Sequence, residues 1–204
     1  PEDLRRLVSG HTAVVQLVAI LHGNEATFDK VHVALPRNLV EACQATGVRR
    51  IVHVSALGVA AEAPSMYQRS KAHGEAVLRE SGLDVSVLRP SVIFGAGDRF
   101  LNMFAAMQRW LPFVPLAGAQ AQFQPVWVED VAEAVARCLE RPVTTGQTYE
   151  CAGPDVLTLE ELVRLAGEVS WHPRAVFGIA DDVGRAQAWL MEHLPGPTLM
   201  SRDN

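Results

Sequence analysis

Three short apolar runs alternate with longer stretches of mixed polarity in the first half of this chain of 204 residues. The runs are residues 13–21, 49–55 and 84–88, and the stretches between them are residues 25–46 and 64–81. The first run has one polar residue, Gln16, and such a run is typical of a strand that is covered on both faces, as in a parallel sheet. Because strands that alternate with helices form right-handed βαβ units, the sequence predicts an α/β fold with a Rossmann-like, doubly wound parallel sheet.

The rest of the chain predicts shorter elements around this sheet. Pro36 is expected to bend or split the helix over residues 25–46, and Gly47 is expected to end it. Residues 111–122 are rich in Pro, Gly and Ala and are predicted to form a loop. The further helices are expected at residues 1–9, 100–110, 129–140, from 158 onward and at 178–194, and the further strands at residues 123–128 and 147–152.

The composition limits the classes of partner and compartment. A net charge of −5, with basic residues scattered along the chain, argues against a nucleic-acid partner. Three cysteines far apart in the sequence give neither a disulfide framework nor a zinc spacing, so we expect a cytoplasmic, reducing compartment and no metal site. The most apolar stretch, residues 100–118, is interrupted by polar residues and prolines and is too broken to span a bilayer.

One stretch of the sequence, residues 55–71, carries three side chains suited to proton transfer. Tyr67 and Lys71 are four residues apart, so on a helix they lie on one face, one turn apart. Ser55 lies where an apolar run ends, and open α/β sheets bind ligands at the ends of their strands. A phenol has a pKa of about 10, which a nearby ammonium lowers, while a serine hydroxyl can hold a substrate carbonyl. Together the three can move a proton while a nicotinamide moves a hydride.

Each of these features has a structural alternative. Tyr67 can pack in the core of an amphipathic helix whose Lys71 remains in water. His32 is expected to be packed or at the surface, and alternatively to face the active site. The large apolar residues that follow position 100 can line a hydrophobic substrate pocket, dock on a partner or membrane surface, or pack in the core. They are Met103, Phe104, Met107, Trp110, Leu111 and Phe113, and Trp189, Leu190, Met191 and Leu194 in the last helix admit the same choice.

The order and spacing of several motifs resemble those of a known family. The segments are HVSALG, YQRSK, RPSVIFG, DRFLN and PVWVEDVA, and together they run through almost all of the chain. They are similar to the atypical, extended branch of the short-chain dehydrogenase/reductases, which includes NAD-dependent epimerases and dehydratases. Within that branch the chain looks closest to the nucleotide-binding accessory subunit of respiratory complex I and its bacterial relatives.

The resemblance implies a Rossmann sheet with a small C-terminal lobe, and NAD or NADP as the cofactor. It divides the chain into a partial NAD(P)-binding core, residues 1–122, and residues 123–204, which hold the remaining sheet strand and a lobe for substrate or partner. Ser55 would orient the substrate, Tyr67 would act as acid or base, and Lys71 would bond the nicotinamide ribose and lower the tyrosine pKa. Leu17, Val18 and Ala19 would lie along the cofactor, and Pro90, Ser91, Val92 and Ile93 would meet its nicotinamide end through backbone groups.

The sequence departs from the family at the phosphate-binding turn. The family begins with a strand, a glycine-rich turn and a helix that hold the pyrophosphate, and the sequence shows no such turn. Its one GxG, Gly95-Ala96-Gly97, lacks the third glycine and precedes Asp98, so we interpret it as a loop on the substrate side. The first residues match the family just before its fourth strand. We therefore expect residues 13–21 to lie at an open edge of the sheet. Either the chain is a fragment or another element covers that edge. We also expect this chain to bind NAD(P) weakly or not at all.

Three functions are compatible with these observations. The first is an NAD(P)-dependent oxidoreductase or epimerase that uses Ser55, Tyr67 and Lys71 to couple a proton transfer to a hydride transfer. The alternative is a non-catalytic nucleotide-binding subunit or assembly factor of respiratory complex I, peripheral to the inner membrane. The third is a remnant that binds no nucleotide. A hydrophobic small-molecule substrate, a membrane-surface association and a homo-oligomer are compatible with the first two.

Overall fold

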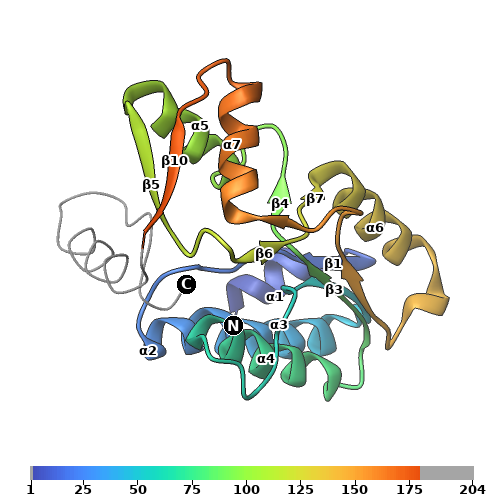
Figure 1. The fold of residues 1–204 in the computed structure, drawn as a ribbon. Helices are drawn as coiled ribbons and strands as arrows, with labels where there is room; N and C mark the ends of the chain where they lie inside the picture. Colours follow the sequence, from blue (N-terminus) through green and yellow to red (C-terminus); the bar gives the residue numbers. More distant parts are fainter. Residues whose placement is uncertain (1, 180–204) are drawn as a thin grey trace. The chain divides into compact units, whose positions relative to one another are not determined.

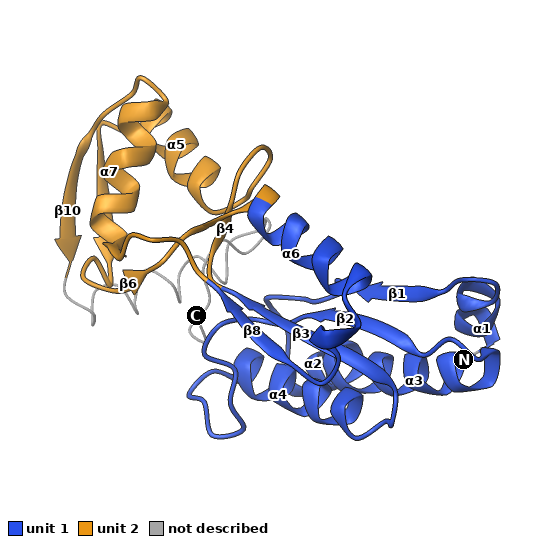
Figure 2. Ribbon diagram, turned by 90° about the vertical axis from the view of Figure 1, so that its right-hand side faces the viewer, with its two compact units in different colours: residues 1–90, 130–151, 203 blue, residues 91–129, 152–202, 204 orange. Residues whose placement is uncertain are grey.

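The computed structural model describes residues 2–179, which form two compact units that interleave along the chain (Figure 2). Among the described residues, unit 1 is built from residues 2–90 and 130–151, and unit 2 from residues 91–129 and 152–179. The division expected after residue 122 stays a prediction. No helix in residues 2–179 is long and apolar enough to cross a bilayer.

Unit 1 contains a four-stranded sheet in which all strands are parallel, and this confirms the predicted fold class (Figure 1). The order is β1-β2-β3-β8, so β1 lies at an edge of the sheet, as expected. The strand predicted over residues 13–21 ends at Gln16, because the Gln16 amide donates to the carbonyl of Val18 and the chain turns out of the sheet. The strands are β1 (Ala13–Gln16), β2 (Arg50–Val54), β3 (Asp84–Pro90) and β8 (Thr148–Cys151).

Helices cover both faces of this sheet, which is therefore doubly wound. Alternate residues of the strands, such as Ile51, Val85 and Val87, form one core with α3 and α4. Val52 and Leu88, which point the opposite way, pack against α6, and Figure 2 shows α6 on the side of the sheet opposite α3 and α4. The helices of this unit are α1 (Glu2–Val8), α2 (Glu25–Phe28), η1 (Asp29–Ala34), α3 (Leu35–Thr46), α4 (Met66–Arg79), η2 (Pro142–Thr144) and most of α6 (Val128–Glu140).

The helical region over residues 25–46 is interrupted by a π-helical turn, η1, rather than by a proline kink. Pro36 lies in the first turn of α3, just after this π-helical turn, and has no N–H to donate back into it. The preceding N–H, that of Leu35, donates to Lys30, five residues back, which is the hydrogen bond of a π-helix. Gly47 ends α3 in the left-handed conformation with φ 76°, as the sequence predicts.

Unit 2 has its own core between two helices and a pair of parallel strands. The residues buried there include Phe104 of α5, Val163 of α7, Val114 of β5 and Val176 of β10. The helix α7 begins with a capping box at Thr158, as predicted. The elements are β4 (Ile93–Phe94) with β7 (Val126–Trp127), β5 (Phe113–Ala117) with β10 (Ala175–Ile179), β6 (Gln122–Phe123) with β9 (Leu157–Thr158), and the helices α5 (Leu101–Trp110) and α7 (Leu159–Val169).

Three of the predicted elements in this unit are wrong. Residues 111–122 are not a loop throughout, because β5 runs through them with Val114 and Leu116 buried. Its pairing partner, β10, is about 60 residues away in the sequence, so local turn residues gave a misleading signal. The single strand predicted at 123–128 is two short strands, β6 and β7. Residues 178–179, predicted as the start of a helix, end β10, and the remainder of that predicted helix lies outside the described residues.

Candidate active site

The helix α4 carries Tyr67 and Lys71 on one face, as their spacing predicts. Ser65 caps the helix by accepting a hydrogen bond from the Gln68 N–H. Lys71 is only 2% exposed, and its Nζ donates a hydrogen bond of 2.9 Å to the carbonyl oxygen of Val54 at the end of β2. The lysine is thus buried against the carboxyl end of a strand and does not extend into water. Burial lowers the pKa of Lys71 to about 8, although the carboxylate of Glu75 acts to raise it.

The ring of Tyr67 is packed between aromatic groups of the neighbouring helical segment. It meets His32 edge-on at 5.5 Å and Phe28 at 6.4 Å between ring centroids. Burial raises the pKa of the Tyr67 hydroxyl. This direction is opposite to the lowering that a nearby ammonium would produce, and burial is its cause. Tyr67 is therefore a neutral phenol at pH 7, the form that can donate a proton.

Ser55 directly follows the last residue of β2 and begins the loop that leads to α4. Its N–H donates to the carbonyl of Leu88 at 2.7 Å, and two residues later Leu57 donates to Pro90 at 2.8 Å. Its side chain is buried, and the hydroxyl makes no hydrogen bond of standard geometry with any of the described residues. The hydroxyl is nevertheless close enough to Glu75 to contribute to lowering the pKa of that carboxyl. An unpaired buried hydroxyl is costly, so this group suits a bound polar ligand or water.

Beneath α4 lies an ion pair that the sequence motifs did not predict. Glu75, one turn after Lys71, is 2% exposed and receives two hydrogen bonds from Arg89, at 3.0 and 2.7 Å, and one from Arg79 at 3.1 Å. Burial acts against its ionisation, but the hydrogen bonds from Arg89 and Arg79, together with the nearby Ser55 hydroxyl, outweigh that effect and lower its pKa. Two features of the sequence could have indicated this pair. Glu75 continues the i, i+4 row of Tyr67 and Lys71, and Arg89 lies inside an apolar strand.

Two buried histidines complete the polar surroundings of Lys71. His32 Nε2 accepts from the Ile20 N–H, so its proton lies on Nδ1, which is 2.8 Å from the Ser70 hydroxyl. His53 Nδ1 lies 2.7 Å from the carbonyl of the Gln16 side chain, while its Nε2 finds no partner within residues 2–179. Burial, followed by the charge of Lys71, lowers the pKa of His32 to about 4 and that of His53 to about 3. Both rings are neutral at pH 7.

The segment after β1, where the resemblance places a cofactor contact, is apolar and exposed. Leu17 and Val18 are 63% and 56% exposed, and Ala19 is also exposed. They follow the carboxyl end of a parallel strand, where ligands of open sheets bind. The Gln16 amide, held by His53, donates to the Val18 carbonyl and fixes the start of this segment. Contact of Leu17, Val18 and Ala19 with a cofactor stays a prediction.

The residues expected at the nicotinamide end fall in both units. Pro90 ends β3, and its carbonyl accepts from Leu57 within unit 1. Ser91, Val92 and Ile93 belong to unit 2, where the Val92 carbonyl accepts from the N–H of Val126 and Ile93 lies in β4. Contact of these four residues with a cofactor stays a prediction.

The Gly95-Ala96-Gly97 loop has a structural role in unit 2. The carboxylate of Asp98 accepts hydrogen bonds from the N–H groups of Leu101 and Asn102 at the start of α5, the shorter at 2.7 Å. An anion that already occupies the first turn of a helix leaves no place there for a phosphate. Among the described residues, no group of His, Cys, Asp and Glu side chains is arranged to hold a metal ion.

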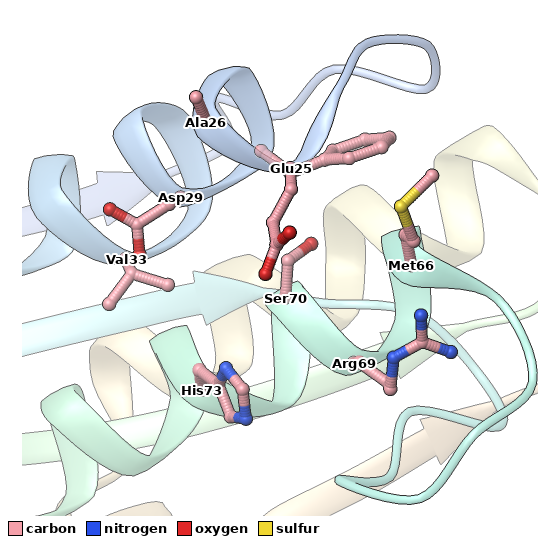
Figure 3. Close-up of a pocket in the computed structure, with 9 residues that line it drawn as sticks. Glu25, Ala26, Asp29, Val33, Met66, Arg69, Ser70 and His73 are labelled. Atoms are coloured by element: carbon pink, nitrogen blue, oxygen red, sulfur yellow. The ribbon is translucent and has the colours of Figure 1, made fainter.

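A pocket of about 520 Å³ lies between α4 and the α2–η1 segment (Figure 3). Its walls on α4 are Met66, Arg69, Ser70 and His73, the helical row beside the one that carries Tyr67 and Lys71. Figure 3 shows the carboxylate of Glu25 directed toward Ser70 across this space. Neither Tyr67 nor Lys71 lines the pocket, so it is adjacent to the candidate active site and separate from it.

The large apolar residues after position 100 divide between the core and the surface of unit 2. Phe104 is buried, and Met103 and Met107 pack against the same core, which supports the structural alternative for these three. Trp110 is 80% exposed and Phe113 is 52% exposed. Leu111 is exposed as well, and the four apolar residues at positions 189–194 lie outside the described residues.

Residues 1–142 match the sequence pattern of a protein family described as NAD(P)H-binding. The chain belongs to this NAD(P)H-binding family. The family match covers the whole of β1 to α4 and the strand β3, and so includes every candidate catalytic residue in unit 1.

The curated relatives of this NAD(P)H-binding chain confirm the resemblance drawn from its motifs. The chain is 31% identical over 163 residues to the mitochondrial NADH dehydrogenase [ubiquinone] 1 alpha subcomplex subunit 9 of Dictyostelium discoideum, with 79% of the chain and 45% of the relative covered. It is 35% identical over 166 residues to the protein of the same name from Rattus norvegicus, with 80% and 44% covered. The chain therefore spans less than half the length of these two relatives.

Solved structures confirm the fold of this member of the NAD(P)H-binding family. The DesIV double mutant, a dTDP-glucose 4,6-dehydratase from Streptomyces venezuelae solved with NAD bound, superposes with a TM-score of 0.79 at 23% sequence identity. The match covers 98% of this chain and 72% of that one. At this identity the similarity establishes a shared Rossmann-like architecture and does not extend to the substrate.

Proposed function

We propose that this chain binds the nicotinamide and ribose end of NAD or NADP at the carboxyl ends of β1 and β2, and that it is an oxidoreductase or epimerase. The observation that carries the proposal is the burial of Lys71 against the end of β2, one turn from Tyr67 on the same helix face. A buried amine is energetically unfavourable, and perturbed groups of this kind are concentrated at functional sites.

Each of the three side chains has a role that its surroundings support. The neutral Tyr67 hydroxyl is the proton donor, because burial keeps the phenol protonated at pH 7. Lys71 donates hydrogen bonds to the ribose and stabilises the phenolate that forms after proton transfer. The unpaired Ser55 hydroxyl orients the reacting oxygen of the substrate. When bound, the nicotinamide supplies or accepts the hydride, and the protein supplies the proton.

The cofactor contact can be tested by substituting the two lysines of the chain, Lys30 and Lys71. In the full-length protein, Lys71→Met is expected to weaken NADH and NADPH binding by roughly tenfold, which corresponds to about 1.4 kcal/mol. Lys30→Met, at an exposed position, should leave affinity unchanged. Calorimetric titration with both nucleotides measures the effect and also distinguishes NAD from NADP. Equal affinity of Lys71→Met and the unmodified protein would argue against the proposed site.

Turnover is tested by Tyr67→Phe, which removes the proposed proton donor and keeps the ring. Turnover is expected to be abolished while nucleotide affinity stays within a few fold, because only the proton transfer is lost. Unchanged turnover in Tyr67→Phe would assign the acid role to another group.

A hydrophobic small-molecule substrate remains part of this proposal, and the exposed Trp110 and Phe113 are the residues that support it.

A second function, association with respiratory complex I at the membrane surface, is supported by the names of two relatives at 31% and 35% identity. In this alternative the site binds nucleotide without turning over a substrate. Co-migration of the full-length protein with complex I from detergent-solubilised membranes, with no turnover in either the unmodified or the Tyr67→Phe protein, would favour it. Migration as a free monomer or homo-oligomer would favour the enzyme.

A further inference from the structure

The carboxylate of Glu75 is fixed in place from two directions beneath α4. Arg89 of β3 donates to both carboxylate oxygens, from Nε at 3.0 Å and from a terminal nitrogen at 2.7 Å. Arg79, one turn later on α4, donates at 3.1 Å. The Glu75 side chain is 3% exposed, whereas that of Arg79 is 41% exposed. A two-pronged contact with a planar guanidinium holds both the position and the charge of a buried carboxylate.

The charge of Glu75 is located where it can act on Lys71. The two residues are four positions apart on α4, so they occupy the same helix face, and Lys71 is buried on that face. The other titratable groups packed around the amine are Tyr67 on α4, His32 from η1 and His53 from β2. The phenol and both imidazoles are neutral at pH 7, and Arg79 and Arg89 are cationic. Glu75 therefore supplies the negative charge in this buried cluster.

We propose that Glu75 is a positioning residue for the active site, whose fixed carboxylate keeps the buried amine of Lys71 protonated and directed at the end of β2. The inference extends the proposed function, because a protonated amine is the form that can donate to a ribose and stabilise a phenolate. Burial favours the neutral form of the Lys71 amine, and the carboxylate of Glu75 acts against this effect. Removing the carboxylate would remove that opposing charge from the same helix face. The amine would then release its proton closer to pH 7.

A purely structural role for Glu75 makes a different prediction. The pair Glu75–Arg89 also joins α4 to β3, so its removal can lower stability whatever happens at Lys71. A clamp of this kind would change the unfolding free energy and leave the protonation of Lys71 unaltered in the folded protein. The pH at which Lys71 titrates thus separates the two roles.

The chain is suited to this measurement because Lys30 and Lys71 are its two lysines. With lysine labelled at the ε carbon with ¹³C, each Cε resonance reports the protonation of one amine, and the exposed Lys30 serves as the internal reference. In Glu75→Gln, the titration midpoint of Lys71 is expected to fall by at least about one pH unit, with Lys30 unchanged. Glu80→Gln, which removes an exposed carboxylate that follows the same helix, is the matched control and should move neither midpoint.

An unchanged Lys71 midpoint in folded Glu75→Gln would overturn the proposal, and so would an equal shift in Glu80→Gln. If Glu75→Gln does not fold, Glu75→Asp keeps the charge but withdraws it from Arg89 and Lys71. A fall of Lys71 by about half a pH unit in this variant supports the proposal, and no shift overturns it. The readout needs no nucleotide and no turnover. A result for Glu75 therefore remains valid even if the proposed function fails.

Discussion

The Nδ1 atom of His32 lies 2.8 Å from the hydroxyl oxygen of Ser70, although 38 positions separate the two residues in the sequence. The Ser70 hydroxyl in turn donates to the Tyr67 carbonyl at 2.8 Å, and His32 Nε2 accepts from the Ile20 N–H. This chain of hydrogen bonds joins the segment that follows β1 to the helix that carries Tyr67. It requires a neutral imidazole, because a protonated Nε2 could not accept from Ile20.

We predict that acid destabilises unit 1 through its two buried histidines. Their folded-state pKa values, about 4 for His32 and about 3 for His53, lie below the ordinary value of 6.5. The stability they contribute is therefore complete above pH 6.5 and is lost as the pH falls toward 4 and 3. Between pH 7 and pH 5 each histidine should cost about 2 kcal/mol of unfolding free energy. Urea unfolding at the two pH values measures this loss, and His32→Asn should show a smaller one.

Lys71 is predicted to make stability rise with pH on the alkaline side as well. Its pKa is lowered from 10.5 to about 8, so its unfavourable burial is relieved as the pH rises between those values. The unfolding free energy should gain about 1.5 kcal/mol from this residue between pH 8 and pH 9.5. Lys71→Met, which keeps the length of the side chain without the charge, should lack this gain. Parallel pH profiles of the two proteins would show that the amine is not perturbed.

Gly74 is predicted to tolerate no side chain, because η1 approaches α4 at this point. A Cβ at Gly74 would lie 2.0 Å from the backbone oxygen of His32, well inside van der Waals contact. Gly74→Ala should therefore cost about 3 kcal/mol and separate Tyr67 from His32. The control is Gly47→Ala, where φ is 76° but nothing lies within 4 Å, and where we expect a loss of about 1 kcal/mol. Thermal unfolding with near-ultraviolet circular dichroism follows both changes.

Arg50 is predicted to be far less replaceable than its neighbour Arg49. The guanidinium of Arg50 donates to the carbonyls of Asp84 and Cys138 and to two hydroxyls, whereas Arg49 forms a surface pair with Asp84. Arg50→Lys cannot reach all four acceptors with one ammonium and should cost about 2 kcal/mol. Arg49→Lys should cost less than about 0.5 kcal/mol. Chemical denaturation of both variants makes the comparison, and similar midpoints would contradict it.

The sheet of unit 1 could be predicted from the sequence because its signals are local. The strands β2 and β3 are rich in apolar residues, and a helix with a recognisable end at Gly47 precedes β2. The spacing of Tyr67 and Lys71 likewise placed both on one helix face. The end of β1 was not predictable in this way, because it depends on a hydrogen bond from Gln16 to Val18.

The features that could not be predicted depend on contacts between distant residues. The pair of Glu75 and Arg89 needs α4 and β3 in place before it can be seen, and a lone acid in a helix is usually solvated. The strand β5 exists because β10 pairs with it, and its own Pro115 and Gly118 favour a loop. The π-helical turn lies just before Pro36, which has no backbone N–H to donate. From the sequence, Pro36 indicates only that the helix is interrupted.

That π-helical turn sets a strict length for the segment Asp29–Ala34. Each residue of a helix advances the chain by about 100° around the axis, so a single deletion here would rotate all of α3 by that angle. Leu39, Val40 and Cys43 would then swing from the sheet toward water, and His32 would lose its place opposite Gly74. A change of one residue in the length of this turn must therefore be compensated within α3.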